Sequence, residues 1–165
     1  DKIADLADLP LTWHFIGPIQ SNKTRAIAEH FHWVHSVERE KIARRLNDQR
    51  PAQLPPLQVC LQVNISGEAS KSGVSPEELP ALAEAVMQMP RLALRGLMAL
   101  PAPCEDPAEQ RAAFARLRAL RDGLRTVAPG MDTLSMGMSG DMEAAIAEGA
   151  TILRIGTAIF GPRER

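Results

Sequence analysis

Apolar stretches alternate with amphipathic, helix-period stretches along this chain of 165 residues. Runs rich in β-branched and large apolar side chains predict six strands, at 13–19, 33–37, 57–65, 92–100, 133–136 and 152–160. Between them, apolar residues recur every three or four positions and predict helices at about 21–30, 38–47, 75–89, 106–128 and 141–148. Strict alternation of strand and helix favours a parallel sheet wrapped by helices.

Two of the predicted helices begin with a capping residue followed by proline. Ser75 is followed by Pro76 and by Glu78 at the third helical position, and Asp106 is followed by Pro107. Such starts satisfy the first free N–H groups of a helix. The predicted core stripes are Ile42, Ala43 and Leu46, then Leu79, Leu82, Val86 and Met89, then Phe114, Leu117, Leu120 and Leu124.

The stretch 133–161 combines a strand, a glycine turn at 137–140, a short helix and a last apolar strand. We expect Ala144, Ala145 and Ile146 on the apolar side of this helix, and Gly149 as its left-handed C-cap. The last run is broken only by Arg154, Gly156 and Thr157, and such runs suit a parallel strand buried on both faces.

Two small, hydroxyl-bearing segments in this stretch favour an anion site. Ser139 and Gly140 open a helix, where unpaired N–H groups and the helix dipole attract phosphate, and Gly156 with Thr157 offers a second close-approach backbone. Spacing alone leaves a second interpretation open, in which Ser139 is only an N-cap and Gly156 only relieves packing. Arg154 needs an acceptor inside an apolar strand, either a ligand or a structural carboxylate.

Bulk composition excludes several classes. The net charge of −1, from 19 Lys and Arg against 20 Asp and Glu, gives no electrostatic case for nucleic acid or an anionic membrane. Cys60 and Cys104 do not suggest a disulfide framework, so reduced thiols in a cytoplasmic protein are expected. No apolar run reaches membrane-spanning length, and no signal peptide is recognised.

The first residues have the spacing of a helix entered midway, because Ile3, Leu6 and Leu9 share one face and no methionine precedes them. We expect residues upstream of Asp1, and a mature N-terminus made by processing is the alternative.

Two separated motifs carry a family resemblance. The segments S-M-G-M-S-G-D-M-E-A-A-I at 135–146 and R-I-G-T-A-I-F-G at 154–161 closely resemble the end of the YggS/PROSC family of pyridoxal phosphate homeostasis proteins. The segment W-H-F-I-G-P-I-Q-S-N-K-T-R-A-I at 13–27 resembles that family's signature stretch. The resemblance covers essentially the whole chain.

The resemblance implies a (β/α)₈ barrel of fold-type III, like the N-terminal domain of alanine racemase. The predicted strands would then be strands three to eight of that TIM-type barrel, and residues 1–165 would form a single, partial barrel domain. A barrel lacking two strands is expected to stay open, with a gap between 13–19 and 152–160 or with another copy of the chain bridging them.

The cofactor implied is pyridoxal 5′-phosphate. By motif, Met138, Ser139, Gly156 and Thr157 would hold its phosphate, and Arg154 would face the pyridine nitrogen. The family's lysine that reacts with the cofactor ends the first barrel strand, a segment with no counterpart here. The role is therefore not transferred to any of the four lysines present, Lys2, Lys23, Lys41 and Lys71.

Catalytic residues are not identified. His30, His32 and His35 cluster in sequence, but their spacing gives a metal site little support, and the role of His14 stays open. The segment Gly96–Ala99 resembles a strand of alanine racemase, yet Leu100 stands where racemases of that group place a histidine. The chain also has no tyrosine to serve as their second base.

The sequence therefore predicts a non-catalytic cytoplasmic protein that carries or buffers pyridoxal phosphate, monomeric when full length. Apo-enzymes that receive the cofactor are its expected partners. Two alternatives stay open: a pyridoxal phosphate-dependent amino-acid racemase-like enzyme, and a phosphosugar-binding barrel enzyme.

Overall fold

A five-stranded parallel sheet lies at the centre of the protein in a computed structural model that describes residues 2–67 and 72–162. Its strands follow chain order and pair in parallel. They are β1 (His14–Phe15), β2 (Trp33–Val37), β3 (Leu57–Gln62), β4 (Leu92–Met98) and β5 (Thr133–Ser135). Parallel neighbours need a crossover between them, and each crossover here contains a helix.

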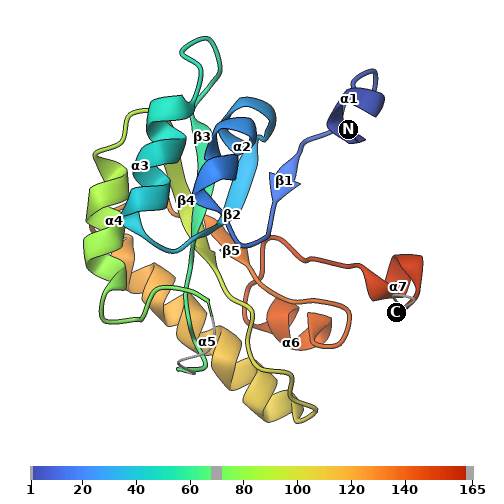
Figure 1. The fold of residues 1–165 in the computed structure, drawn as a ribbon. Helices are drawn as coiled ribbons and strands as arrows, with labels where there is room; N and C mark the ends of the chain where they lie inside the picture. The colour runs from blue at the N-terminus through green and yellow to red at the C-terminus, as the bar shows by residue number, and fades with distance from the viewer. Residues whose placement is uncertain (1, 68–71, 163–165) are drawn as a thin grey trace.

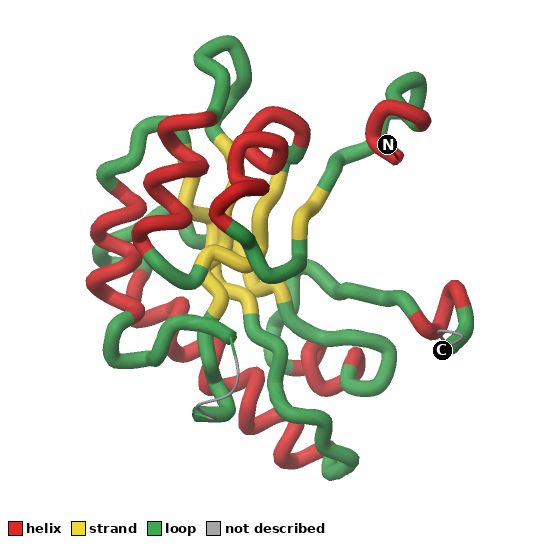
Figure 2. Tube along the Cα trace, viewed as in Figure 1, coloured by secondary structure: helices red, strands yellow, loops and turns green. Residues whose placement is uncertain are grey.

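The crossover helices lie outside the sheet, which occupies the middle of Figure 2. They are η1 (Ser21–Lys23) with α2 (Thr24–His30), then α3 (Glu40–Gln49), α4 (Leu79–Met87) and α5 (Pro107–Leu124). The short helix α6 (Met142–Ala147) follows β5. Two further short helices, α1 (Lys2–Asp5) and α7 (Thr157–Phe160), stand away from the body on the same side of the molecule (Figure 1).

The predicted core stripes are confirmed for the three longest helices. Each presents its stripe to the sheet, and Leu120 alone of these residues is only partly buried. Full burial of one such aliphatic side chain stabilises the fold by about 1.5–3 kcal/mol. The predicted start of α5 is confirmed, because the Asp106 carboxylate accepts from the Ala108 N–H at 2.9 Å. The predicted start at 75 is wrong: the Ser75 hydroxyl accepts from the Glu78 N–H at 3.2 Å, but 76–78 form a turn and α4 begins only at Leu79.

The sheet is curled into a half-barrel. His35 on β2 and Ser135 on β5 are 2.7 Å apart, although β3 and β4 separate their strands in the sheet. Neighbouring strands are about 4.8 Å apart, so in a flat sheet these positions would be roughly 14 Å apart. The contact requires strong curvature, with both side chains on the inner face.

The predicted strand at 152–160 is wrong over most of its length. Pairing with β5 is limited to the isolated bridge between Ser135 and Ile152 and to hydrogen bonds as far as Arg154, and 157–160 form helix α7. In the described chain no strand lies on its other side, so nothing holds the run extended or buries it. Ile159 and Phe160 are accordingly 67% and 85% exposed. Ile146 is also exposed, contrary to its predicted place on the apolar side of α6.

The predicted strand at 13–19 shrinks to the two residues of β1, which pair with β2 alone. Among the described residues, no backbone hydrogen bond joins β1 to 152–156. A hollow of about 460 Å³ lies there, lined by His14, Ile16 and residues 152–156. The sheet is therefore open at this point, as the sequence predicted, and the described part of the chain has five strands where six were expected.

Candidate functional site

The turn after β5 depends on Gly137. Its φ of +94° lies in the left-handed region, and a Cβ there would lie 2.5 Å from the Cβ of Ala145 and 2.8 Å from the Cδ2 of Leu153. Only glycine meets both demands. The close approach seats α6 against the turn and places 138–140 at the carboxyl end of the sheet, the end that holds ligands in open parallel sheets and barrels.

Backbone hydrogen bonds bring a second turn next to the first. The Met136 N–H donates to the Ile152 carbonyl at 3.1 Å, and the Arg154 N–H donates to the Gly137 carbonyl at 2.9 Å. Residues 152–154 thus run alongside the end of β5, and 156–157 follow directly.

Two side chains fix these turns. The Ser139 hydroxyl accepts from the Ala158 N–H at 3.2 Å and so joins the first turn to α7. The Asp141 carboxylate accepts from the Met138 N–H at 2.6 Å. The N–H of Met138 is therefore already paired, which leaves its exposed side chain as its available contribution to a ligand.

Four neighbouring N–H groups lack a partner. Within the described chain, the backbone N–H groups of Ser139, Gly140, Gly156 and Thr157 make no hydrogen bond. Unpaired N–H groups at two adjacent turns, with two hydroxyls between them, form the kind of concave donor set that binds phosphate. The residues present therefore fit an anionic phosphate ester.

Arg154 carries the cation of the site. Its Nη1 donates to the Ser135 hydroxyl at 3.0 Å, and its Nη2 donates to the Ala99 carbonyl at 2.9 Å. Both acceptors are neutral, and no carboxylate among the described residues forms an ion pair with Arg154. The positive charge can therefore pair with a ligand or with solvent, because no salt bridge within the described chain neutralises it.

Two histidines extend the polar network behind Arg154. Ser135 also contacts His35 Nδ1 at 2.7 Å, and His35 Nε2 lies 2.8 Å from His14 Nδ1. His35 is fully buried, whereas His14 is partly buried and stacks on Trp33 with ring centroids 5.4 Å apart.

Burial governs the protonation of these groups. It lowers the pKa of His35 from 6.5 to about 4, with further lowering by the nearby charges of His14 and Arg154. Burial also lowers the pKa of His14, with His32 adding to the effect. The pKa of Arg154 is lowered by burial and supported by Asp141, but a guanidinium stays protonated throughout the ordinary pH range. Both histidines of the network are therefore neutral at pH 7.

The remaining candidates lie elsewhere. Lys2, Lys23 and Lys41 are exposed, and Lys71 lies outside the described residues. His30 is exposed at the end of α2, and His32 accepts from the Trp13 N–H at 2.9 Å, so the three histidines of 30–35 do not converge. Over residues 2–67 and 72–162, no group of three or more His, Cys, Asp or Glu side chains is arranged to hold a metal ion.

The thiols and the helices add little chemistry. Burial raises the pKa of the Cys60 thiol to about 12, so it stays protonated, and Cys104 is also a free thiol. No helix in the described part of the chain has the length and apolar character needed to cross a membrane.

Sequence reasoning gave no site role to Ser135, Ala99 or Asp141, and it considered His35 only as a metal ligand with little support. His35 and Ser135 each interrupt a buried apolar strand with a polar side chain, which is the signal that marks an inward-facing functional position. Their contact, across 100 positions of sequence, has no local signature.

Comparison with known proteins agrees with the architecture. Residues 7–164 match the family model described as alanine racemase, N-terminal domain. The chain is 72% identical over 163 residues to the pyridoxal phosphate homeostasis protein of Pseudomonas aeruginosa, covering 99% of this chain and 70% of that protein. It is 57% identical over 167 residues to the protein of the same name from Escherichia coli K12, covering 99% of this chain and 71% of that protein.

Solved structures give the same picture. PipY of Synechococcus elongatus PCC7942, solved with PLP bound, is 40% identical with a TM-score of 0.86, covering 97% of this chain and 76% of PipY. An alanine racemase of Clostridium difficile has a TM-score of 0.77 at 13% identity, covering 98% of this chain and 43% of that enzyme. The second likeness shows the fold alone.

Proposed function

The chain belongs to the family of pyridoxal phosphate homeostasis proteins, built on the alanine racemase N-terminal domain, and we propose that it binds pyridoxal 5′-phosphate and carries or buffers that cofactor. The observation that carries the proposal is the pair of adjacent turns beside Arg154, whose four N–H groups have no partner among the residues that the structure describes. The binding of PLP by the related PipY gives independent support.

We assign the phosphate to the two turns. Ser139 and Thr157 contribute their hydroxyls and, with Gly156, their N–H groups, while Met138 contributes its exposed side chain beside them. Glycine and small residues let a phosphate approach the backbone closely, which larger side chains would prevent.

We assign the pyridine nitrogen to Arg154. When bound, pyridoxal phosphate supplies an electrophilic aldehyde and an aromatic ring able to withdraw electrons. A fixed guanidinium beside the ring nitrogen opposes its protonation, because two positive charges repel each other in a site of low dielectric. Arg154 therefore holds the ring in its weakly electron-withdrawing form, which suits storage rather than carbanion chemistry.

A carrier role without catalysis fits the side chains present. The chain contains no tyrosine, and Leu100 follows the segment that ends at Ala99, the residue whose carbonyl binds Arg154. Two-base racemisation requires an acid–base group on each face of the substrate, and this chain has no tyrosine to serve as the second of them. Both neutral histidines of the network are engaged with each other and with Ser135.

We further propose that the five strands and the 152–154 segment correspond to strands three to eight of a (β/α)₈ barrel, with 1–165 as one partial barrel domain. We propose apo-enzymes that use the cofactor as recipients, a monomer for the full-length protein, and a cytoplasmic location. The free thiols of Cys60 and Cys104 support a reducing compartment.

Titration with pyridoxal phosphate and with pyridoxal tests the proposal. We expect saturable binding of pyridoxal phosphate with a change in its visible absorbance, and binding of pyridoxal weaker by at least about tenfold, because the phosphate makes several charge-assisted hydrogen bonds. Equal affinities would contradict the phosphate assignment, and no binding of either compound would contradict the function.

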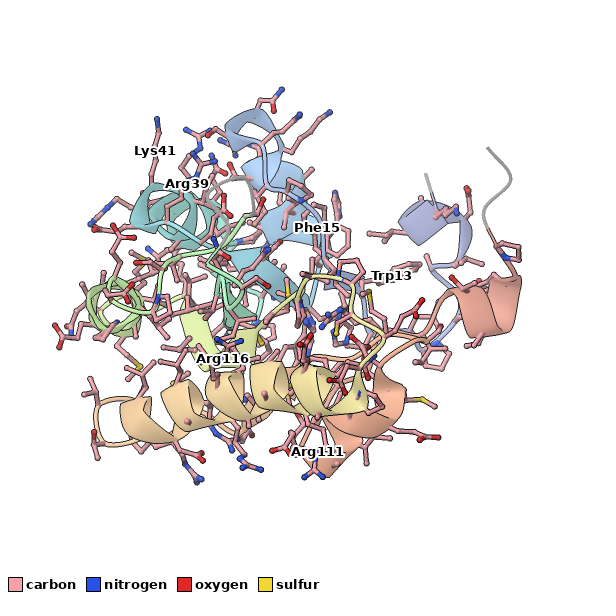
Figure 3. The ribbon with its side chains drawn as sticks, turned by 90° about the horizontal axis from the view of Figure 1, so that it is seen from below. Trp13, Phe15, Arg39, Lys41, Arg111 and Arg116 are labelled. Atoms are coloured by element: carbon pink, nitrogen blue, oxygen red, sulfur yellow. The ribbon has the colours of Figure 1, made fainter. Side chains whose placement is uncertain are left out.

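Substitution of Arg154 tests the ring contact. Arg154→Leu is expected to weaken binding of pyridoxal phosphate about tenfold or more and to shift its absorbance, because a buried charge contact is lost. Arg116→Leu is the matched control, since Arg116 on α5 (Figure 3) is exposed and is not among the residues assigned to the cofactor. Conversion of L-alanine to D-alanine by the loaded protein would favour the racemase alternative instead.

A further inference from the structure

A continuous chain of buried and partly buried polar groups leads from β1 to Arg154. It runs from His14 on β1 to His35 on β2, across the inner face to Ser135 on β5, and on to the Arg154 guanidinium. The three links measure 2.8, 2.7 and 3.0 Å. Each is a normal hydrogen-bond distance, so the four side chains form one network.

The Arg154 guanidinium decides which atoms donate and which accept hydrogen bonds along this network. A guanidinium only donates, so the Ser135 oxygen accepts from it. The Ser135 hydroxyl then has its own proton to place, and its other neighbour among the described residues is His35 Nδ1. His35 must accept there, which puts its proton on Nε2, and this proton is donated to Nδ1 of His14. His14 in turn carries its proton on Nε2.

The opposite direction leaves a buried group unpaired. If His35 carried its proton on Nδ1, the Ser135 oxygen would accept two hydrogen bonds and its own proton would face no acceptor in the described chain. Ser135 is fully buried, so this proton could not reach water. An unmade buried hydrogen bond costs about 1–3 kcal/mol, which decides between the two directions.

We propose that His35 is a positioning residue for Arg154, and that His14 and His35, both neutral with the proton on Nε2, fix the Ser135 hydroxyl so that it holds the guanidinium in place. The carbonyl of Ala99 fixes one end of the guanidinium, and Ser135 is its only other described partner. A serine hydroxyl rotates freely unless an acceptor holds its proton, and His35 is that acceptor. The proposal rests on the proposed function only where it concerns the cofactor.

The charges around the two histidines oppose their protonation. His14 faces His35 and Trp33, with His32 close by on the adjoining strand end, and His35 faces His14 and Arg154. Cys60 on β3 is a protonated thiol, and Asp141 at the start of α6 acts on Arg154. No carboxylate in the described part of the chain compensates a charge on either imidazole. Protonating His35 would place a second donor against Ser135 and break the network.

Nitrogen-15 NMR of the histidine rings in the cofactor-free chain tests the network directly. We expect both His14 and His35 to show the Nε2–H tautomer at pH 7. A Nδ1–H tautomer for either ring, or a charged imidazolium at that pH, would overturn the proposal. This measurement needs neither a variant nor a ligand, so it separates the network from the cofactor assignment.

Variants test the positioning role. His35→Asn keeps a hydrogen-bond acceptor near the position of the His35 Nδ1 atom, whereas His35→Leu removes it. We expect the Arg154 guanidinium N–H signals to sharpen and resist exchange in the parent chain and in His35→Asn, and to broaden in His35→Leu. Affinity for pyridoxal phosphate should fall about tenfold in His35→Leu and be largely restored in His35→Asn, in line with loss of one hydrogen bond to a charged group.

His30→Leu is the control, because His30 is exposed at the end of α2. Unchanged Arg154 signals in a folded His35→Leu chain would overturn the proposal. If His35→Leu does not fold, the tautomers of the parent chain decide. If the parent chain has the expected tautomers and ordered Arg154 signals but binds no pyridoxal phosphate, the proposed function fails and the network stands.

Discussion

Ser139 and Ala158 are joined by a hydrogen bond of 3.2 Å from the Ala158 N–H to the Ser139 hydroxyl. This bond links the turn before α6 to the first turn of α7, and its two residues are 19 positions apart in the sequence. It also sets the spacing of the four unpaired N–H groups proposed to bind phosphate. The hydroxyl of Ser139 is therefore a structural link, and in the proposed site it is also a ligand group.

Ser139→Ala should weaken phosphate binding more than it weakens the fold. The bond lies at the surface, so its loss should cost at most about 1 kcal/mol of unfolding free energy. Pyridoxal phosphate should bind several-fold more weakly, because a hydroxyl donor is lost and the two turns can separate. Ser139→Thr keeps the hydroxyl and is expected to bind as the parent does. Equal affinity of Ser139→Ala and the parent, measured by titration, would assign the hydroxyl to structure alone.

The local sequence pattern predicted β2 and the start of α5 well. The strand at 33–37 is β2 with the same bounds, and Asp106 caps α5 as expected. These elements are decided by short-range chemistry, either a run of apolar residues or a side chain within reach of free N–H groups.

The segment 152–160 shows where such prediction ends. Its apolar run is typical of a strand buried on both faces, but the pattern does not reveal whether a neighbour is present on each side. In the described structure β5 is the only neighbour, so pairing stops near Arg154 and Phe160 is exposed. The same limit applies to the site: local motifs predicted Ser139, Arg154 and Thr157 as site residues, whereas the contact of His35 with Ser135 depends on how the sheet curls.

Acid should destabilise the chain partly through His35. The folded-state pKa of His35 is lowered from 6.5 to about 4, so between these values the unfolded chain binds more protons than the folded one. The stability is fully present above pH 6.5 and is lost as the pH falls toward 4, by roughly 3 kcal/mol in all. Urea unfolding measured across this range should show the loss.

Comparison with variants isolates this contribution. The hydrogen bond from Arg95 lowers the pKa of Asp132, so protonation of Asp132 also destabilises the folded chain, but at a lower pH. The relevant quantity is therefore the difference between parent and His35→Leu, whose stability should depend less on pH between 6.5 and 4. His30→Leu should follow the parent. Parallel curves for the parent and His35→Leu would show that burial of His35 carries no such penalty.

Glu148 joins the end of α6 to α5 through ion pairs with two arginines. Replacing both arginines should destabilise the fold more than replacing Glu148 itself. Its side chain is only 6% exposed and binds Arg111 at 2.7 Å and Arg118 at 2.9 Å, and Figure 3 shows Arg111 where the two helices meet. Replacing both arginines by alanine leaves a buried carboxylate without a partner, at a cost of about 3 kcal/mol. Glu148→Gln removes the charge together with the ion pairs and should cost less.

Thermal unfolding distinguishes these cases. We expect the double arginine variant to melt at least about 5 °C below the parent, with Glu148→Gln between them. Arg116→Ala, an exposed position on the same helix, controls for the loss of a surface arginine. A double variant as stable as Arg116→Ala would mean that Glu148 is not effectively buried. Weaker binding of pyridoxal phosphate should accompany the destabilisation, because α6 follows the turn of Ser139.

The last prediction concerns attachment of the cofactor: binding to this 165-residue chain should be reversible, without stoichiometric covalent labelling of lysine. A lysine amine becomes a nucleophile when burial or a neighbouring cation favours its neutral form. Lys2, Lys23 and Lys41 are exposed, and Lys41 projects from α3 away from the α5–α6 side of the molecule (Figure 3). The proposed site instead holds its ligand through N–H groups, hydroxyls and Arg154. Incubation with pyridoxal phosphate, reduction with borohydride and peptide mass spectrometry should therefore find only scattered, substoichiometric labels, while dialysis without reduction removes the cofactor. Free pyridoxal serves as the control for non-specific labelling. One label per chain at Lys23 or Lys71 would contradict this prediction and would identify a lysine that completes the site.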